Sequence, residues 1–264
     1  MSALFAIFGN PVVHSKSPLM HNRAFKELGV DACYGRWRLE EGERLKVTFL
    51  ALGLKGANIT VPHKEAAFEA ADYLEDFAKE VRAVNTLVLK EDKLHGYNTD
   101  APGFFRALQK HGTPGSALII GAGGTARALA LYLKRQNTAV TILNRSAGRL
   151  AWFEEAGFEV ATWEAFEPAA FDAVINTTSA GLEDESLPMP EKPLKETLRR
   201  SRLAAEVIYG KTTPFLRLAD SLRLPSFDGS EMLLQQGILA FDYFTDHRFD
   251  LDTVEAAMRP ALSL

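Results

Sequence analysis

Residues 116–126 read SALIIGAGGTA and decide the fold of this chain. A short apolar run leads into the pattern Gly121-x-Gly123-x-x-Ala126, and the helix-forming segment RALALYLKRQ follows it. The first glycine allows a tight turn, the second lets backbone N–H groups approach a pyrophosphate, and the small alanine lets helix and strand pack closely. The stretch therefore predicts a dinucleotide-binding turn. A plain strand-turn-helix with flexible glycines is the alternative.

The second half of this signal lies about 20 residues further on, where a ribose-binding residue is expected. The apolar segment TAVTIL ends in Asn144-Arg145-Ser146, and Arg149 follows. NAD enzymes usually place an acidic residue here to bind the ribose 2′-OH, whereas two guanidinium groups and a hydroxyl suit a 2′-phosphate. The spacing favours NADP(H) as the cofactor, and the alternative is that the arginines are solvated charges at the start of a helix.

Composition is typical of a globular enzyme that acts on a small molecule. The chain has 264 residues, 47% of them hydrophobic and 24% charged, with a net charge of −4. That charge argues against a general nucleic-acid or membrane surface, because both need a basic face. Cys33 is the only cysteine, so no internal disulfide can form and a cytoplasmic location is expected. The first ten residues lack a basic leader region and read as a first strand.

The first hundred residues alternate between strand and helix patterns, which indicates an α/β domain. Strands are expected at 4–8, 33–39, 56–61 and 83–89, and helices at 19–29, at 44–54 and after Pro62, with Lys64 in the first turn of the last. Residues 90–100, KEDKLHGYNTD, read as a hairpin-like turn.

A second domain begins near residue 101 and follows a β-α-β rhythm, which predicts a Rossmann-type doubly wound parallel sheet with its ligand at the carboxyl ends of the strands. Strands are expected at 117–121, 138–144, 171–178 and 203–209, helices at 124–136 and 146–157, and a surface loop at 183–195. Two further helical stretches, 231–247 and 253–262, are expected to return to the first domain. The predicted organisation is thus a substrate domain of residues 1–100 completed by 231–264, and an NADP-binding domain of 101–230.

Reduction of a ketone creates an alkoxide that must be protonated as it forms, so a hydride carrier needs a proton donor beside it. Lys64 follows a strand and a proline, where its ammonium can project into a site. Asp100 ends the segment GYNTD and can pair with Lys64 across a cleft between the domains. The alternatives are a solvated surface lysine and an aspartate that only caps the following helix.

Other polar residues of the first domain suit substrate binding. Ser15 and Ser17 flank Lys16 in the loop after the first strand, and two hydroxyls at i and i+2 can donate to one carboxylate. A serine-rich helix entry explains them equally well. Asn85 lies among apolar residues and is expected to point into the site, and Thr60 adds a hydroxyl near Lys64. The six histidines show no metal-binding spacing, so no metal is predicted.

Seven motifs, taken in order, resemble those of the shikimate dehydrogenase family, from Phe8 to about Phe241. They are S-K-S at 15–17, N-I-T-V-P-H-K at 58–64, A-V-N-T at 83–86, G-Y-N-T-D at 96–100, G-A-G-G-T-A at 121–126, N-R-S at 144–146 and D-G followed by M-L-L-Q-Q-G. The resemblance implies reversible reduction of 3-dehydroshikimate to shikimate with NADPH, on the chorismate pathway to the aromatic amino acids.

The resemblance also implies a role for each matching residue of the substrate site. Lys64 matches the catalytic lysine, with Asp100 beside it. The positions that match substrate contacts are Ser15 and Ser17 for the carboxylate, Thr60, Asn85 and Asp100 for the ring oxygens, and Lys64 and Gln236. Gln235 is the adjacent alternative to Gln236.

For the cofactor, the matching positions fall into three groups. They are Gly121, Ala122, Gly123, Gly124 and Thr125 at the pyrophosphate, Asn144, Arg145, Ser146 and Arg149 at the 2′-phosphate, and Tyr209 and Gly229 near the nicotinamide. Three features depart from the pattern of the family: Glu206 stands where aspartate is frequent, Gly210-Lys211 where Asn-Pro is common, and Glu231 where glycine is frequent. These departures lie on the nicotinamide side of the expected cofactor site.

Three other functions remain as alternatives. A quinate/shikimate dehydrogenase would prefer NAD and an acidic residue near the ribose, and the basic turn at 144–149 weighs against it. A non-catalytic NADP sensor would have no need of both Lys64 and Asp100. A methylenetetrahydrofolate-type dehydrogenase would bind a pterin, whereas the serine pair favours a small carboxylate. The oligomeric state stays open, with a homodimer as one option.

Overall fold

The computed structural model describes residues 2–263 and divides the chain into two compact units. The first unit comprises Met1–Gly103 and Leu234–Leu264, and the second comprises Phe104–Leu233. The fold class is mixed α/β, and each unit contains one six-stranded sheet.

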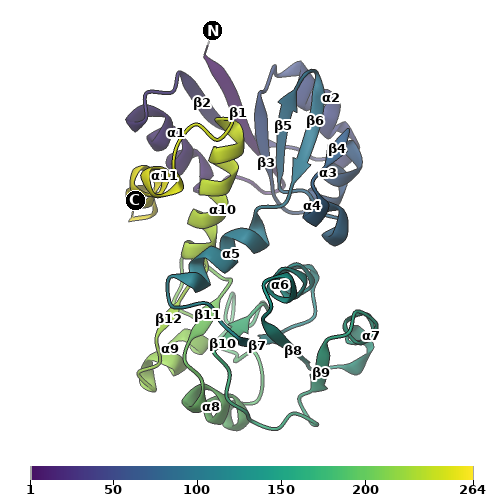
Figure 1. The fold of residues 1–264 in the computed structure, drawn as a ribbon, viewed down its shortest axis with the longest axis vertical. Coiled ribbons are helices and arrows are strands. Elements are labelled where there is room, and N and C mark those ends of the chain that lie inside the picture. Colours follow the sequence, from purple (N-terminus) through teal and green to yellow (C-terminus); the bar gives the residue numbers. More distant parts are fainter. Residues whose placement is uncertain (1, 264) are drawn as a thin grey trace. The chain divides into compact units, whose positions relative to one another are not determined.

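The first unit contains a mixed sheet whose strands lie in the order β2-β1-β3-β5-β6-β4 (Figure 1). β1 pairs in parallel with β2 and β3, whereas β5 pairs antiparallel with β3 and β6. Its elements are β1 (Ala3–Gly9), α1 (Ser17–Glu27), β2 (Ala32–Arg38), η1 (Gly42–Arg44), α2 (Leu45–Ala51), β3 (Gly56–Ile59), α3 (Lys64–Ala70), β4 (Tyr73–Leu74), α4 (Asp76–Val81), β5 (Thr86–Lys90), β6 (Lys93–Tyr97), the start of α5 (Asp100–Gln109), most of α10 (Gly229–Phe244), α11 (Leu251–Met258) and η3 (Arg259–Ser263).

Strand β1 is buried on both faces, because its side chains alternate between two apolar layers. Ala6 and Phe8 belong to a core cluster with residues of α2 and α3. Phe5 points to the other face, where its ring lies 5.3 Å from that of Phe25 on α1 and 4.8 Å from that of Phe244 on α10. The C-terminal helices therefore complete the core of this unit, and α11 packs against α1.

The structure corrects the prediction for residues 83–100. Strand β5 begins only at Thr86, and residues 93–97, expected within a turn, form strand β6. The turn is confined to Glu91 and Asp92, which have φ values of +49° and +58°. Each residue of KLHGY then pairs antiparallel with β5, so the charged residues that indicated a loop belong to a hairpin strand. The short elements β4 and α4 were not predicted at all.

The second unit is a parallel sheet in the order β12-β11-β10-β7-β8-β9, in which every neighbouring pair is parallel (Figure 1). This order confirms the doubly wound sheet, because the chain leaves β7 in one direction toward β9 and returns on its other side at β10. The elements are β7 (Ser116–Ile120), α6 (Gly124–Arg135), β8 (Ala139–Asn144), η2 (Ala147–Arg149), α7 (Ala151–Glu155), β9 (Glu159–Thr162), β10 (Ala173–Asn176), α8 (Glu191–Arg200), β11 (Ala204–Glu206), α9 (Pro214–Ser221) and β12 (Ser226–Phe227).

The surface loop predicted at 183–195 is wrong in its last five residues, which open helix α8. The prolines of this segment indicated a loop but are compatible with a helix. Pro190 precedes the helix and Pro193 lies in its first turn, where the missing backbone N–H has no helical partner to lose. Leu194 and Leu198 on α8 are buried in the sheet-facing core of the unit. Burial of this apolar stripe stabilises the helix despite its charged sequence.

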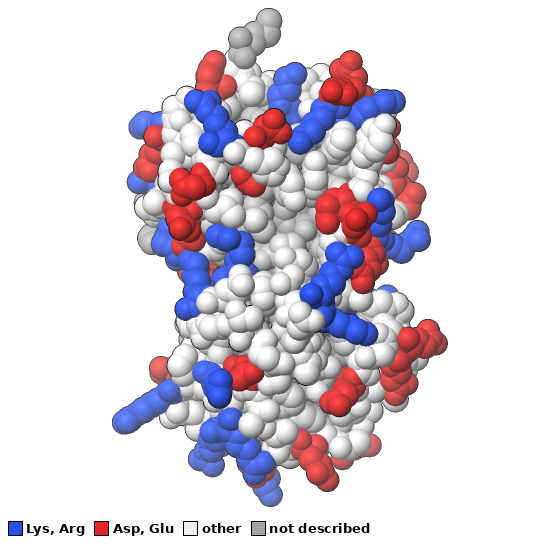
Figure 2. All heavy atoms as spheres, viewed as in Figure 1, with Lys and Arg blue, Asp and Glu red and all other residues white. Residues whose placement is uncertain are grey.

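The described surface carries mixed charge and no membrane-spanning element. On the face shown in Figure 2, Lys and Arg side chains are interspersed with Asp and Glu in each unit. No helix within residues 2–263 has the length and apolar character to cross a membrane. Over the same residues, no cluster of three or more His, Cys, Asp and Glu side chains is placed to hold a metal ion.

Candidate active site

Lys64 and Asp100 form an ion pair within the first unit. Lys64 is the first residue of α3 and Asp100 is the first residue of α5. The distance from Lys64 Nζ to Asp100 Oδ2 is 2.6 Å, and the two side chains are 33% and 18% exposed. Two residues that are 36 positions apart in sequence are thus brought together, and both side chains remain partly exposed.

The position of Lys64 is fixed by the residue before it and by its own carbonyl. His63 is 3% exposed, and its Nε2–H donates to the Leu39 carbonyl oxygen at 2.6 Å. The Lys64 carbonyl accepts from the backbone N–H of Val84 at 3.0 Å. The histidine therefore has a structural place, anchoring the start of α3 to the end of β2.

Asp100 is held on both carboxylate oxygens and at its backbone. Asn85 Nδ2 donates to Asp100 Oδ1 at 2.9 Å, while Lys64 occupies Oδ2. The side-chain oxygen of Asn98 accepts the Asp100 N–H at 3.1 Å. The side chain that binds a backbone N–H at the start of α5 is therefore that of Asn98, and the Asp100 carboxylate binds Lys64 and Asn85.

Asn85 is 2% exposed and connects Asp100 to a buried network of polar side chains. Its Oδ1 accepts from the Thr99 N–H at 2.8 Å and from the Thr86 hydroxyl at 3.1 Å. Asn58 donates to the Thr86 hydroxyl at 3.0 Å and accepts from the Tyr34 hydroxyl at 2.7 Å. The amide of Asn85 therefore has one orientation. Sequence reasoning singled out Asn85 but missed the threonines beside it in A-V-N-T and N-T-D, and Tyr34.

The serine loop, which we define as residues 14–17, connects β1 to α1. Ser15 is partly exposed and its Oγ accepts the Ser17 N–H at 3.2 Å, whereas Ser17 is 2% exposed. Lys16 Nζ donates to the Leu262 carbonyl oxygen at 2.9 Å. The helix-entry interpretation thus holds for the Ser15 oxygen, but its hydroxyl hydrogen stays available to an incoming acceptor.

The remaining predicted substrate contacts lie on β3 and α10. Thr60 directly follows β3, and its methyl group lies so near Gly9 that a Cβ there would be 2.4 Å away. Gln235 is fully buried and donates to Glu255 Oε2 on α11 at 2.9 Å. Gln236 lies against Gly103, three residues after Asp100, where a Cβ would be 2.5 Å from the Gln236 backbone nitrogen. Gln236 therefore stays the predicted substrate contact, with Gln235 as the alternative.

In the second unit, the glycine-rich turn between β7 and α6 has the shape of a phosphate cradle. Gly121 has a φ of +114°, and a Cβ there would be 2.6 Å from Thr177 Oγ1, so only glycine fits. A Cβ built on Gly123 or Gly124 would meet nothing within 4 Å. The start of α6 is therefore open, with Ala122 buried beneath it and Thr125 exposed beside it. These residues fit a pyrophosphate at a helix N-terminus.

The turn after β8 presents the residues that the sequence assigned to a 2′-phosphate. Asn144 Nδ2 donates to the Ser146 carbonyl oxygen at 2.9 Å, which closes the turn. Arg145, Ser146 and Arg149 are all exposed, the last within η2. Two guanidinium groups and a hydroxyl are thus free to bind an anion at the carboxyl end of a strand next to β7.

Tyr209 and Gly229 lie in a region that Glu206 organises. Glu206 is fully buried and its carboxylate accepts from Asn176, Thr213 and the N–H groups of Val207 and Ile208. Burial raises the pKa of this carboxyl, although the hydrogen bonds oppose the shift. A Cβ on Gly229 would be 2.2 Å from the Val207 carbonyl oxygen, so close packing requires this glycine. Tyr209 is 42% exposed.

Comparison with known proteins agrees with the geometry of both units. Residues 7–87 match the family model described as the shikimate dehydrogenase substrate binding domain, and residues 229–259 match the shikimate 5′-dehydrogenase C-terminal domain. The chain is 46% identical to the shikimate dehydrogenase (NADP(+)) of Helicobacter hepaticus over 97% of its own length and 96% of that protein.

Two solved structures complete the comparison. Shikimate 5-dehydrogenase from Thermus thermophilus in complex with NADP(H) and shikimate is 37% identical, with a TM-score of 0.85 over 98% of this chain and 99% of that one. The 5-ketofructose reductase of a Gluconobacter strain is 28% identical, with a TM-score of 0.82 over 98% and 99% of the two chains. By its sequence relatives, its family models and its fold, the chain belongs to the NADP-dependent shikimate dehydrogenase family of oxidoreductases.

Proposed function

We propose that this protein catalyses the reversible reduction of 3-dehydroshikimate to shikimate with NADPH. The observation that carries the proposal is the Lys64–Asp100 pair, whose Nζ and Oδ2 atoms lie 2.6 Å apart and whose aspartate is bound by Asn85. The relatives of this chain are named as shikimate dehydrogenases, which supports the same activity. A cytoplasmic location is part of the proposal and is supported by the single cysteine of the sequence.

The open glycine turn and the exposed basic turn support binding of NADPH by the second unit. Backbone N–H groups of residues 121–125 would hold the pyrophosphate, because no side chain occupies the space above Gly123 and Gly124. Asn144, Arg145, Ser146 and Arg149 would hold the 2′-phosphate. When bound, NADPH supplies the hydride.

Lys64 performs the proton transfer in this proposal. As the substrate carbonyl carbon gains a hydride, its oxygen develops negative charge, and the Lys64 ammonium donates a proton to that oxygen to give the alcohol. In the oxidation of shikimate, the neutral amine takes the proton back. Asp100 keeps the ammonium in place through its hydrogen bond, and Asn85 keeps Asp100 in place.

The serine loop supports recognition of a carboxylate. The Ser15 oxygen accepts the Ser17 N–H, and the Ser15 hydroxyl donates no hydrogen bond to another residue of the described chain. Two hydroxyls at Ser15 and Ser17 can donate to the two oxygens of one carboxylate. We assign the ring oxygens of the substrate to Thr60, Asn85, Asp100 and Gln236.

A spectrophotometric assay of the reduced nicotinamide tests this function. Wild-type protein should oxidise shikimate much faster than quinate, and with NADP rather than NAD. Lys64→Ala should lower kcat by about 10²–10⁴-fold, the usual contribution of a positioned acid or base, and leave KM within several-fold. Lys79→Ala, which removes an exposed lysine of α4, serves as the control. An unchanged kcat in the Lys64 variant removes this residue from the mechanism.

Cofactor choice is tested separately at the basic turn. Replacing Arg145 and Arg149 with alanine removes two charge-assisted contacts that only a 2′-phosphate can make. The KM for NADPH should rise by about tenfold or more for the pair, in line with about 1.5–3 kcal/mol for a charged hydrogen bond, whereas the KM for NADH should stay close to the wild-type value. Equal changes for both cofactors would argue against a phosphate clamp.

A further inference from the structure

We propose that Arg36 is a positioning residue that fixes the serine loop and makes the enzyme selective for a substrate bearing a carboxylate. The inference rests on the proposed function of Ser15 and Ser17. It starts from two contacts: Arg36 Nη2 donates to the Ser15 carbonyl oxygen at 2.6 Å, and Arg36 Nε donates to the same oxygen at 3.1 Å. Two N–H groups converging on one oxygen define its direction as well as its distance.

The sheet brings Arg36 to this place. β2 is the edge strand and pairs in parallel with β1, so that Arg36 lies opposite Ile7, near the end of β1. Tyr34, two residues earlier on the same face of β2, is buried with its ring stacked on that of His21 of α1 at 4.4 Å. Arg36 emerges beyond this buried contact, is exposed, and reaches the loop that leads into α1.

The contact leaves the serine loop with little freedom except at its hydroxyl hydrogens. The Ser15 carbonyl is held by Arg36, the Ser15 Oγ accepts the Ser17 N–H, and the Lys16 ammonium is bound to the Leu262 carbonyl. Each bond restricts a different part of residues 15–17. The Ser15 Oγ is consequently held in one position, which reduces the entropy lost when a carboxylate binds.

Arg36 also brings a positive charge that no described residue neutralises. Within residues 2–263, Arg36 forms no ion pair, whereas Arg38, two positions further on the same face of β2, lies 3.7 Å from Glu40 Oε1. Two serine hydroxyls alone are neutral donors that also bind an ester or a sugar hydroxyl, although less strongly than an ionised acid. The uncompensated guanidinium next to Ser15 favours the ionised acid, because it stabilises the anion and not a neutral analogue.

The experiment compares shikimate with its methyl ester as substrates for the wild type, Arg36→Ala and Arg36→Lys. Wild-type protein should prefer the acid. Arg36→Ala should raise the KM for shikimate about tenfold and leave kcat within about twofold. The KM for the ester should rise by less, because the ester loses only the positioning of the serine loop whereas the acid also loses the nearby positive charge, so that the preference for the acid falls. Arg36→Lys should give an intermediate preference, since it keeps the charge but not the two-pronged contact.

Arg38→Ala is the matched control, because it removes the same charge from the same face of the strand. It deletes a hydrogen bond to the Asn10 side chain and leaves the two Arg36 contacts with the Ser15 carbonyl oxygen intact. Its acid-to-ester preference should equal that of the wild type. The inference is overturned if Arg36→Ala keeps the wild-type preference, if it weakens both substrates equally, or if Arg38→Ala reproduces its effect. Absence of shikimate turnover in the wild type would instead overturn the proposed function.

Discussion

At the scale of single residues, Asn85 controls the geometry of the candidate site. The orientation of a buried side-chain amide is fixed when its oxygen faces a group that can only donate a hydrogen bond and its nitrogen faces a group that can only accept one. The backbone N–H of Thr99 can only donate, and it points at Asn85 Oδ1, while the ionised Asp100 carboxylate can only accept, and it receives Asn85 Nδ2. The orientation of Asn85 thus determines where one oxygen of Asp100 lies, and through Asp100 where the Lys64 ammonium lies.

Asn85→Ala should therefore damage both stability and catalysis. The buried Thr99 N–H would lose its acceptor, at a cost of about 1–3 kcal/mol in the free energy of unfolding. Asp100 would lose one of its two anchors, and we expect kcat to fall about tenfold, since small misplacements of a catalytic group are costly. Urea unfolding and steady-state kinetics measure the two effects. Asn85→Ala with wild-type kcat would show that Lys64 alone keeps Asp100 in place.

At the scale of elements, the sequence predicted the segments whose own pattern dictates their structure. The central strands β1, β7 and β8 and the helix α6 were predicted within one or two residues, because apolar runs and a glycine turn are local signals. The hairpin strand β6 and the start of α8 were missed, because cross-strand pairing and burial of one apolar stripe override charged residues and prolines.

The same division applies to the candidate site. Lys64 was predicted to pair with Asp100 from its place at a helix start and from the place of Asp100 at the end of GYNTD, and the two side chains lie in hydrogen-bond contact. The expected cleft between the domains was wrong for this pair, because both residues lie in the first unit. Thr99, Tyr34 and Arg36 were not predicted to hold the site, because each acts through a partner that only the tertiary fold brings near. A threonine within N-T-D carries no sign in sequence that its backbone N–H orients a distant asparagine.

Gly103→Ala should destabilise the protein where two helices cross. α5 and α10 come so close at this point that a Cβ on Gly103 would be 2.5 Å from the backbone nitrogen of Gln236 and 2.7 Å from its Cα. Backbone atoms cannot rotate away, so the helices must separate. We expect a loss of about 1–3 kcal/mol in the free energy of unfolding, despite the gain of up to about 1 kcal/mol from helix propensity.

The control for this change is Gly124→Ala at the first residue of α6, where an added Cβ meets nothing within 4 Å. In the absence of cofactor it should leave the free energy of unfolding unchanged or slightly raised. The close crossing also sets the spacing between Asp100 and Gln236, so Gly103→Ala should raise the KM for shikimate. A stability equal to that of the wild type would mean that the helices accommodate the methyl group without moving apart.

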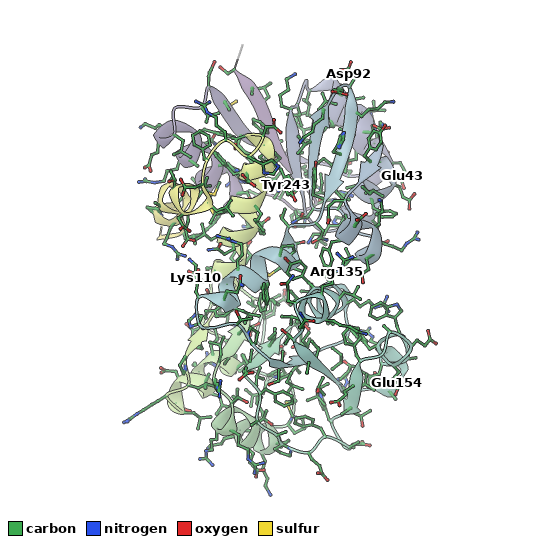
Figure 3. All side chains as sticks on the ribbon, in the orientation of Figure 1. Glu43, Asp92, Lys110, Arg135, Glu154 and Tyr243 are labelled. Atoms are coloured by element: carbon green, nitrogen blue, oxygen red, sulfur yellow. The ribbon has the colours of Figure 1, made fainter. Side chains whose placement is uncertain are left out.

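At the scale of the whole molecule, the two units have different chemical tasks and different cores. Lys64, Asp100 and the buried polar network around Asn85 all lie in the first unit. The core of this unit is completed by helices from the C-terminal end of the chain. There the ring of Tyr243 on α10, labelled in Figure 3, stacks on that of Tyr97 at 3.9 Å. The stability of the candidate site therefore depends on residues that are far from it in sequence, and conditions that destabilise this shared core should inactivate the enzyme.

Acidification is such a condition, because His21 lies in that core. His21 is fully buried among aromatic rings of α1, β2 and α10, and neither ring nitrogen has hydrogen-bonding geometry to a described residue. Burial lowers its pKa from 6.5 to about 3, and the nearby Asn58 side chain opposes only part of this shift. The unfolded chain therefore binds one proton more than the folded one between these two pH values, so stability falls as the pH decreases from 6.5.

His21→Phe should remove this dependence. One proton taken up on unfolding lowers the folding equilibrium constant of the wild type by up to about tenfold per pH unit below about pH 6.5, and a phenyl ring takes up none. Urea unfolding of both proteins between about pH 7.5 and about pH 4.5 measures the difference in their free energies of unfolding, which should widen steadily toward the acidic end.

Glu206, whose raised pKa acts in the opposite direction, is present in both proteins and cancels from the comparison. The aspartates with lowered pKa values lose their contribution progressively below about pH 5, and because they are present in both proteins they also cancel from the comparison. Parallel stability curves for the two proteins would show that His21 is protonated in the folded state, which its burial among aromatic rings opposes.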